Sequence, residues 1–333
     1  MNSEPAAALH PFSRLEPDAI LDAVESTGVR CDGRLLALNS YENRVYQVWL
    51  DDGTAIVAKF YRPQRWSAAA IQEEHDFALE LAAREIPVVA PLQMNGRTRH
   101  EHRGFQFALY PRRGGRTPEF GDAETLQWLG RFIARIHAVG ALQPFAHRPV
   151  LDIESFGWEP AQFVRESGFV PDDLHEAYVS VVDDVLERVE YRWAATGPVR
   201  RLRLHGDCHA GNILWTDAGP HFVDLDDARM GPAVQDLWMC LSGDRAAQQE
   251  QLLPLLEGYS EFREFDPAEL MLIEALRTLR MVHYAGWLAR RWDDPAFPAS
   301  FPFFNTQRYW QDHILALREQ AAALDEPPLR WQR

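Results

Sequence analysis

Several residue types and patterns are scarce or missing in this chain of 333 residues, and each absence excludes a class of protein. Its three cysteines form no Cys-x-x-Cys pair and no disulfide framework, which favours a reducing compartment. No apolar run approaches the roughly 20 residues that cross a bilayer, and the N-terminus lacks the apolar stretch of a signal peptide. We therefore expect a cytoplasmic protein with no membrane partner.

Positive charge is also scarce, because 34 Lys and Arg face 49 Asp and Glu, for a formal net charge of −15. Nucleic-acid backbones attract basic surfaces, so we expect no nucleic-acid partner, although a nucleotide needs only a local positive site. Apolar residues make up 46% and charged residues 25%, which are values of a globular protein. At this length two lobes are expected.

The most informative stretch present is the loop that follows the apolar run ending at Leu204. Asp207 and Asn212 stand five residues apart in it, and Asp224 follows after twelve more residues and a second short apolar run. Phosphoryl transfer asks a protein for a carboxylate near the acceptor hydroxyl and for hard oxygen ligands of Mg²⁺. This spacing therefore predicts Asp207 as the catalytic base, and Asn212 and Asp224 as ligands of Mg²⁺ bound with ATP.

Other interpretations of the loop remain open from the residues alone. Asp, Asn and Gly are common in ordinary turns. His205 and His209 have the spacing of a metal pair, but Gly206 and Gly211 argue against the helix that would align them. A metallophosphoesterase would need an Asp-x-His upstream, which is not found at a suitable place. A catalytically silent nucleotide-binding regulator is disfavoured because the acidic set is intact.

The first third of the chain indicates a small β-rich lobe. A helix is expected over 17–27, then a hairpin of strands 44–50 and 54–60 joined by the turn Asp51-Asp52-Gly53. A further strand over 105–111 ends at a Pro, and the following Arg-Arg-Gly-Gly is a plausible hinge.

The acidic motif resembles that of the aminoglycoside phosphotransferase and choline kinase family. Protein kinases share the five-residue spacing from Asp to Asn, but His205-Gly206-Asp207 replaces their His-Arg-Asp as it does in that family. The resemblance implies an α+β, two-lobed, protein-kinase-like fold. It places a nucleotide-binding N-lobe at 1–112 and a larger helical C-lobe, with the catalytic loop and acceptor site, at 113–333.

The same resemblance assigns nucleotide-binding residues in the N-lobe. Lys59 ends the strand Ile-Val-Ala-Lys as the phosphate-binding Lys of kinases does, and should pair with a Glu of the helix expected over 67–84. Glu73 and Glu74 both qualify, and the family offset favours Glu74. There is no G-x-G-x-x-G loop; Ser40 is our candidate nucleotide contact, with simple turn formation as the alternative.

Helices are expected in the C-lobe over 125–139, 172–193 and 267–292. His137 is interpreted as a core or capping histidine. Asp236 is expected to cap a helix and also to brace the catalytic loop through its backbone, with helix capping alone as the alternative. The aromatic residues near the C-terminus pack in the lobe or wall the acceptor site; they are Trp287, Trp292, Phe297, Phe301, Phe303, Phe304, Tyr309 and Trp310.

Further segments across nearly the whole chain resemble bacterial stress-response Ser/Thr protein kinases of this family. They include residues 39–46, Lys59-Phe60-Tyr61-Arg62-Pro63, residues 223–229 and the stretch from Arg290 to Pro298. The resemblance implies a monomeric, cytoplasmic kinase that uses ATP and Mg²⁺ on protein Ser or Thr. The alternative is a small-molecule kinase for an amino alcohol, homoserine-like or aminoglycoside-like hydroxyl. Local acidic residues would then attract a cationic acceptor, or are only solvated; they are Glu154, Glu159, Asp172 and Asp173.

Overall fold

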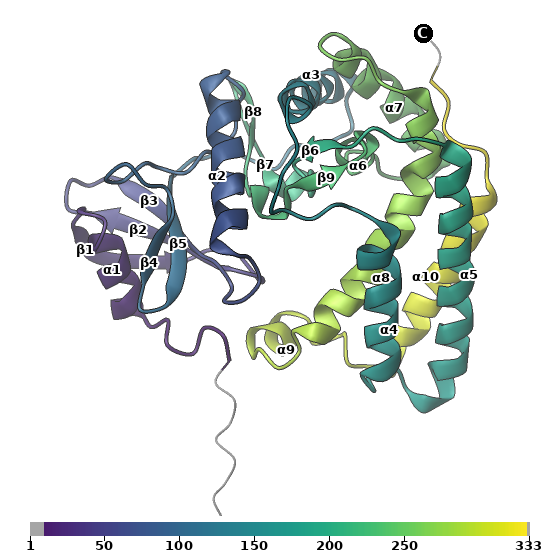
Figure 1. Ribbon diagram of the computed structural model, residues 1–333, viewed down its shortest axis with the longest axis horizontal. Coiled ribbons are helices and arrows are strands. Elements are labelled where there is room, and N and C mark those ends of the chain that lie inside the picture. The colour runs from purple at the N-terminus through teal and green to yellow at the C-terminus, as the bar shows by residue number, and fades with distance from the viewer. Residues whose placement is uncertain (1–9, 332–333) are drawn as a thin grey trace, which may run out of the picture. The chain divides into compact units, whose positions relative to one another are not determined.

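The computed structural model describes residues 10–331, so the ends of the expected lobes, 1–9 and 332–333, lie outside the described residues (Figure 1). The chain forms two compact units that are discontinuous in sequence. The sheet unit comprises the described chain up to Asp76, Ala90–Arg113 and Trp292–Phe301. The helical unit comprises Phe77–Val89, Gly114–Arg291 and the chain from Pro302 onward. The change of unit between Arg113 and Gly114 lies one residue from the expected boundary. Two segments differ from the expected division, because Phe77–Val89 belongs to the helical unit and Trp292–Phe301 to the sheet unit.

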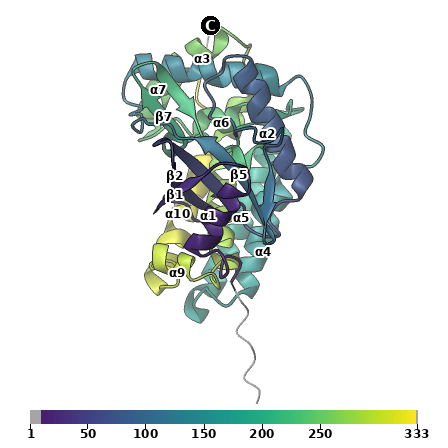
Figure 2. The same cartoon turned by 90° about the vertical axis from the view of Figure 1, so that its left-hand side faces the viewer.

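The sheet unit is built on five antiparallel strands in the order β1-β2-β3-β5-β4, which face the viewer in Figure 2. The strands are β1 (Cys31–Ala37), β2 (Arg44–Leu50), β3 (Ala55–Phe60), β4 (His100–His102) and β5 (Phe105–Pro111). The predicted hairpin and the strand at 105–111 are confirmed. β1 and β4 were not predicted: β1 is a largely exposed strand with no β-branched residue, and β4 has only three residues.

Helix α1 (Pro17–Glu25) packs its apolar side onto this sheet, where Ile20 and Val24 meet Val48 and Phe107 in one core cluster. The helix confirms the prediction over 17–27. Helix α2 (Ala68–Ala83) matches the helix expected over 67–84, and Asp76 is the last of its residues in the sheet unit.

A segment distant in sequence completes the sheet unit, and it contains the short helix α9 (Ala296–Ser300). The buried carboxylate of Asp294 accepts hydrogen bonds from Arg44 at 3.1 Å and from Arg62 at 2.6 Å. The ring of Phe301 lies 4.7 Å from that of Tyr41, in the loop between β1 and β2. These contacts explain why residues so far along the chain group with the N-terminal sheet.

The helical unit holds most of the helices. They are α3 (Ala123–Gly140), α4 (Glu159–Glu166), α5 (Asp172–Thr196), α6 (Val234–Trp238), α7 (Arg245–Ser260), α8 (Ile273–Arg290) and α10 (Gln307–Asp325), with a π-helical turn at Glu154–Trp158. The helices predicted over 125–139 and 172–193 are confirmed. The third prediction is corrected at its start, because Pro267–Leu272 is a 3₁₀ helix whose N-terminal Asp266 accepts from Ala268 N–H, and the α-helix begins at Ile273.

Helices α3 and α7 approach so closely that a side chain would not fit at two points. A Cβ on Gly130 would lie 2.0 Å from the Leu255 carbonyl oxygen, and one on Gly258 would lie 2.1 Å from that of Gln127.

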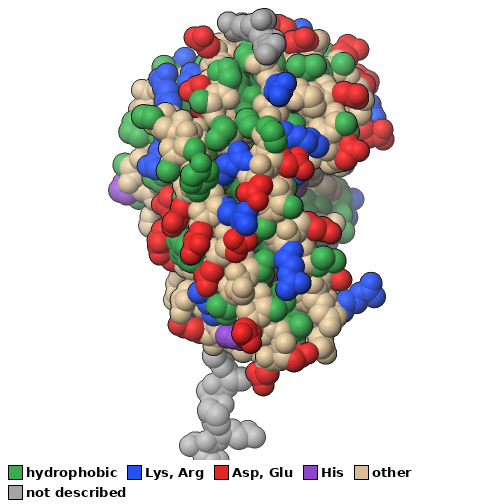
Figure 3. All heavy atoms as spheres, turned by 90° about the vertical axis from the view of Figure 1, so that its right-hand side faces the viewer, with side chains coloured by type: hydrophobic (Ala, Val, Ile, Leu, Met, Phe, Trp, Pro, Cys, Tyr) green, Lys and Arg blue, Asp and Glu red, His purple; other side chains and the backbone are tan. Residues whose placement is uncertain are grey.

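On the face of α5 and α10 shown in Figure 3, acidic and basic side chains are interspersed. Across residues 10–331, no helix is at once long and apolar enough to span a membrane.

Candidate active site

The catalytic loop leaves the buried strand β6 (Leu202–Leu204), which pairs antiparallel with β9 (Arg229–Gly231). Gly206, the second residue of the loop, has φ +85°, and a Cβ there would lie 2.1 Å from the carbonyl oxygen of Asp227. Only glycine combines this backbone conformation with such a close approach. The Gly in His205-Gly206-Asp207 is therefore required by the path of the loop.

Asp236 holds this loop by its backbone. Its Oδ2 accepts from the N–H of His205 and its Oδ1 from that of Gly206, both at 2.9 Å, and His137 Nε2 lies 3.0 Å from Oδ2. Asp236 lies inside the first turn of α6, whose N-terminus has no side-chain cap. The bracing prediction is confirmed, the capping alternative is wrong, and His137 is a buried core histidine as expected.

The buried Asp236 remains an anion because of these partners. Burial by itself would raise its pKa, but the hydrogen bond and charge of His137, the charge of His205 and the Gly206 N–H together lower the pKa below its ordinary value. A carboxylate that stays ionised keeps both oxygens as acceptors, which the two loop N–H groups need.

A hairpin brings the two expected Mg²⁺ ligands near Asp207. Asn212 precedes β7 (Ile213–Thr216), and Asp224 lies two residues after β8 (Gly219–Phe222). The strands pair Ile213 with Phe222, and Val223 N–H donates to the Asn212 carbonyl at 3.0 Å. Asn212 Nδ2 in turn donates to the Asp207 carbonyl at 2.9 Å and to Asp207 Oδ2 at 3.2 Å. The two predicted strands exist, but β6 and β8 belong to separate sheets.

The donor set suits a hard cation. Asn212 uses its amide nitrogen on Asp207, which leaves its Oδ1 as the atom available for a metal. Asp224 is exposed and has a left-handed backbone, φ +61° and ψ +66°, rare for a residue with a side chain. One amide oxygen and one carboxylate fit Mg²⁺, which keeps waters and substrate phosphates in its shell. No group of three His, Cys, Asp or Glu with metal-site geometry occurs among residues 10–331.

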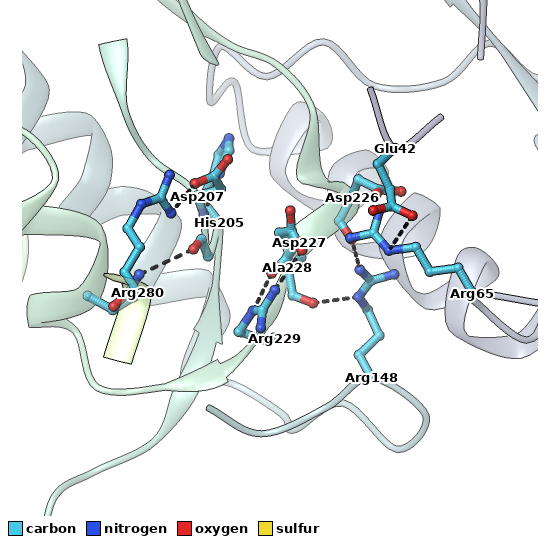
Figure 4. Close-up of polar contacts among 12 residues, drawn as sticks. Glu42, Arg65, Arg148, His205, Asp207, Asp226, Asp227, Ala228, Arg229 and Arg280 are labelled. Atoms are coloured by element: carbon cyan, nitrogen blue, oxygen red, sulfur yellow. Dashed lines mark hydrogen bonds and ion pairs between the residues drawn. The ribbon is translucent and has the colours of Figure 1, made fainter. Parts of the chain in front are cut away.

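Two side chains that the sequence analysis did not single out as partners contact Asp207. Arg280 Nη1, from α8, donates to Asp207 Oδ1 at 2.7 Å (Figure 4). His209 Nε2 lies 3.3 Å from Oδ2. Burial raises the pKa of Asp207, but the His209 hydrogen bond and the Arg280 charge outweigh it and hold the pKa below its ordinary range. Asp207 is therefore a carboxylate at neutral pH, the form that can accept a proton.

The two histidines of the loop serve the loop itself and do not form a metal pair. His205 Nε2 lies 2.9 Å from the Val223 carbonyl oxygen, linking the loop to the segment that carries Asp224. His209 Nδ1 accepts from the Gly211 N–H at 2.9 Å while its Nε2 faces Asp207. Both nitrogens of His209 and Nε2 of His205 thus have partners within the protein. These contacts argue against a metal site formed by the two histidines.

Arg148 fixes the segment that follows Asp224. The guanidinium is buried and donates to the carbonyl oxygens of Ala228, at 2.5 Å from Nε, and of Asp226 (Figure 4). Arg229 adds a local contact to the Asp227 side chain at 2.6 Å. Nothing near Arg148 in the sequence signals this role, because its partners lie about 80 residues away along the chain.

In the sheet unit, Lys59 Nζ lies 3.3 Å from Glu74 Oε1, and both residues are buried. The Tyr61 ring centroid is 4.9 Å from the same ammonium group. The Lys59 partner favoured by the sequence, Glu74, is therefore the one found in this ion pair. Lys59 is also the only lysine of the chain, whose other 33 basic residues (34 minus 1) are arginine. A lysine kept at one position in a chain otherwise rich in arginine indicates a specific need for its compact ammonium group, because Arg differs from Lys in shape and hydration. The prediction of Lys59 did not use this signal.

Ser40 takes part in the turn between β1 and β2. Its Oγ accepts from the Val45 N–H at 3.1 Å and lies 3.4 Å from the Leu38 carbonyl oxygen. The turn-forming role is present, and contact with a nucleotide stays a prediction.

The C-terminal aromatics and the four acidic residues considered for the acceptor site lie in different surroundings. Half of the eight C-terminal aromatics are buried: Phe304 and Trp310 in the helical unit, and Phe297 and Phe301 in the sheet unit. The four acidic residues considered for a cationic acceptor are exposed and lie in the first turns of helical segments, where they complement the helix dipole; they are Glu154, Glu159, Asp172 and Asp173.

Known proteins match this chain closely in sequence and in fold. Stress response kinase A of Escherichia coli K12 is 49% identical over 319 residues, 96% of each chain, and the serine/threonine protein kinase RdoA of Salmonella typhimurium LT2 is 47% identical over the same span. Among solved structures, the amicoumacin kinase hAmiN with AMP-PNP and Ca²⁺ has a TM-score of 0.69 at 18% identity, over 90% of both chains. Spectinomycin phosphotransferase has 0.67 at 13% identity, over 92% of this chain and 98% of its own.

The expected α+β kinase-like fold, with an N-terminal sheet and a larger helical part, is confirmed by these structural neighbours. The model of the phosphotransferase enzyme family matches residues 34–273, which contain Ser40, Lys59, Glu74, Asp207, Asn212 and Asp224. The chain therefore belongs to the phosphotransferase enzyme family.

Proposed function

We propose that this phosphotransferase is a Ser/Thr protein kinase that uses ATP and Mg²⁺, with a role in stress response. The observation that carries the proposal is the placement of Asp207, Asn212 and Asp224 on one hydrogen-bonded loop and hairpin. The names of relatives with almost half of their residues identical over nearly the whole chain support the protein acceptor.

Each residue has a role in this proposal. Asp207 orients the acceptor hydroxyl and takes its proton as the oxygen attacks the γ-phosphorus and the bond to the β-phosphate oxygen breaks. Asn212 and Asp224 hold Mg²⁺, which supplies neutralising charge on the phosphates. Lys59, oriented by Glu74, binds nucleotide phosphates, and Ser40 contacts the nucleotide. In this scheme residues 1–112 bind the nucleotide and 113–333 carry the chemistry and the acceptor site.

The acceptor is tested by incubating the protein with γ-labelled ATP and, separately, a generic Ser/Thr protein and a panel of amino alcohols, homoserine and aminoglycosides. Label on protein Ser or Thr is expected. Label on small alcohols alone would overturn the protein-kinase proposal in favour of the small-molecule alternative, which the same active-site residues would serve.

Asp224→Ala tests the metal role, because removing one of two protein ligands should abolish Mg²⁺-dependent activity at any accessible Mg²⁺ concentration. Asp217→Ala is the matched control, since Asp217 is an exposed acid in the β7–β8 turn. A Mg²⁺ titration that is the same in Asp224→Ala and the control would remove Asp224 from the ligand set.

The lone lysine permits a direct test of the nucleotide role. An acyl-phosphate derivative of ATP transfers its acyl group to an amine beside the phosphates, and only Lys59 and the α-amino group of the chain offer one. We expect modification of Lys59 that excess ATP suppresses. Modification that is confined to the α-amino group, or that ATP does not suppress, would contradict phosphate binding by Lys59.

We further propose that the protein acts as a cytoplasmic monomer without nucleic-acid or membrane partners. Sedimentation of the purified chain alone and with ATP should give the mass of one chain, about 38.2 kDa. A dimer under either condition would overturn this part.

A further inference from the structure

Helix α8 carries three arginines, and only one of them contacts the expected catalytic base. Arg277 donates to Gln248 Oε1 at 3.0 Å and lies over Trp238, and Arg290 donates to the Glu159 carbonyl at 3.2 Å and covers Phe163. Both therefore support packing between elements. Arg280 instead places Nη1 2.7 Å from Asp207 Oδ1 (Figure 4).

In this arrangement every oxygen of the base already accepts a hydrogen bond. Oδ1 has Arg280, and Oδ2 has Asn212 Nδ2 at 3.2 Å and His209 Nε2 at 3.3 Å. An ionised carboxylate has about four acceptor positions, so an acceptor hydroxyl can use the position that remains on Oδ1, where it lies beside the Arg280 guanidinium.

Of the three donors to Asp207, Arg280 has the most capacity to bind a further partner. Asn212 is anchored by a second hydrogen bond to the Asp207 backbone and His209 by one from Gly211 N–H. The Arg280 side chain is 45% exposed, and its other N–H groups have no hydrogen-bond partner within residues 10–331. Ion pairs this exposed are weak, so a second anion can compete for the guanidinium.

We propose that Arg280 selects acceptors that carry an anionic group, a carboxylate or a phosphate, close to the reacting hydroxyl. The acceptor anion pairs with the unused N–H groups of the guanidinium, and the acceptor hydroxyl binds Asp207 Oδ1 beside it. Arg280 is thus a specificity-determining residue that recognises charge on the acceptor next to the base.

The surroundings of Arg280 favour an anion over a cation. His283, one turn further along α8, has a pKa lowered to about 3, first by burial and then by the charge of Arg229, with Arg291 and Arg280 contributing. His283 is therefore neutral. The negative charge of Asp227, which Arg229 contacts at 2.6 Å, partly offsets the positive charge of these arginines. A cationic acceptor group next to Arg280 would be repelled.

This inference rests on the proposed kinase function, and matched acceptors keep the two separable. One set consists of four peptides with a single acceptor Ser, flanked by Glu, by phosphoserine, by Gln or by Lys. The other consists of N-acetylserine and its uncharged amide. The wild type should use each anionic member with a kcat/KM about tenfold above its neutral partner, on the scale of one close charge pair. Comparison of the Glu peptide with the phosphoserine peptide distinguishes recognition of a carboxylate from recognition of a phosphate.

Arg280→Gln should reduce the ratio of anionic to neutral kcat/KM to about one, and Arg280→Glu should turn the preference toward Lys peptides. Arg290→Gln, on the same helix, should keep the wild-type ratio. ATP binding and the thermal unfolding midpoint are measured for every variant, so that a misfolded variant is recognised. If a variant does not fold, the preference of the wild type between anionic and neutral acceptors still tests the proposal.

Two results would overturn the inference. One is a wild type that uses neutral and anionic acceptors equally. The other is a fall of kcat/KM in Arg280→Gln by the same factor for all acceptors, which would make Arg280 only a positioning residue for Asp207. If label enters the small acceptors but no peptide, the protein-kinase proposal fails, and the ratio for N-acetylserine and its amide still decides the role of Arg280.

Discussion

The ion pair of the sheet unit and the catalytic loop of the helical unit are constructed in opposite ways. Lys59 and Glu74 project from a regular strand and a regular helix, are both buried, and meet each other directly at 3.3 Å. Asp207 stands on an irregular loop, is partly exposed, and owes its position to Asp236 and Gly206.

This difference separates stability from chemistry. A buried ion pair is costly to break, because the remaining charge is left in a low-dielectric interior. A partly exposed carboxylate on a braced loop can be changed with little effect on folding, provided that the brace remains. Substitutions in the two regions should therefore have different dominant readouts.

The largest effect is expected for Asp207→Asn. It should lower turnover by about two to four powers of ten, the usual contribution of a positioned acid or base, while ATP binding and the unfolding midpoint persist. Initial rates with saturating ATP, beside a thermal melt, provide the measurement. Asp217→Asn is the control, and a turnover near that of the wild type in Asp207→Asn would end its assignment as base.

Lys59→Met should act mainly on stability, in contrast to Asp207. Removing the cation beside the buried Glu74 should cost about 3–5 kcal/mol in the free energy of unfolding, and Lys59→Met with Glu74→Gln should recover most of it. Urea unfolding of the single and double variants measures the coupling. Arg34→Met, at an exposed ion pair on β1, serves as a control that should leave stability unchanged. If Lys59→Met matched that control, the contrast between the two regions would be lost.

Asp236→Asn should connect the two readouts. An amide has one acceptor oxygen, so one of the N–H groups of His205 and Gly206 loses its partner, at a cost of about 1–3 kcal/mol, and turnover should fall as the loop loosens. Because the folded pKa is lowered, the stability from this carboxylate is present above the unfolded value near 3.9 and is lost as the pH falls through the lowered folded value.

Unfolding at pH 7 and in acid, together with turnover, tests this expectation for Asp236→Asn. Asp244→Asn is the control, since Asp244 caps α7 and Asn is an equally good cap. Equal stability and turnover in both variants would show that the brace is dispensable.

The smallest effect concerns pH near neutrality. Burial raises the pKa of Glu269 to about 7, and its Oε2 accepts from the N–H of Val234, the first residue of the helix that carries Asp236. The folded protein keeps this proton up to about pH 7, whereas the unfolded chain loses it near pH 4.3, so stability from the group falls as the pH rises between these values.

Glu269→Gln removes this titration and should make the variant more stable than the wild type by about 1–2 kcal/mol at pH 8 but not at pH 4. Unfolding midpoints at both pH values measure the effect. A constant difference between wild type and variant across this range would refute the raised pKa.

Much of the fold was predictable because local patterns specify it. Segments rich in β-branched and aromatic residues around an Asp-Asp-Gly turn predicted the β2–β3 hairpin. Residues typical of helix ends predicted α1, and apolar patterns predicted α2, α3 and α5. Helix α7 was not predicted, and it contains Pro254, a residue that normally breaks a helix. The addition of residues 292–301 to the sheet unit was not predictable either, because Asp294 meets Arg62 across 232 positions.

The sequence by itself determined the acidic set of Asp207, Asn212 and Asp224, the lone Lys59 and the family resemblance, because fixed spacing and residue chemistry need no knowledge of distant contacts. Tertiary structure decided which glutamate meets Lys59, and it placed Arg280 and His209 on the base. Arg280 lies 73 positions from Asp207, and only packing of α8 brings it within 2.7 Å. Long side chains choose partners by proximity in the folded chain, and no spacing in the sequence records that choice.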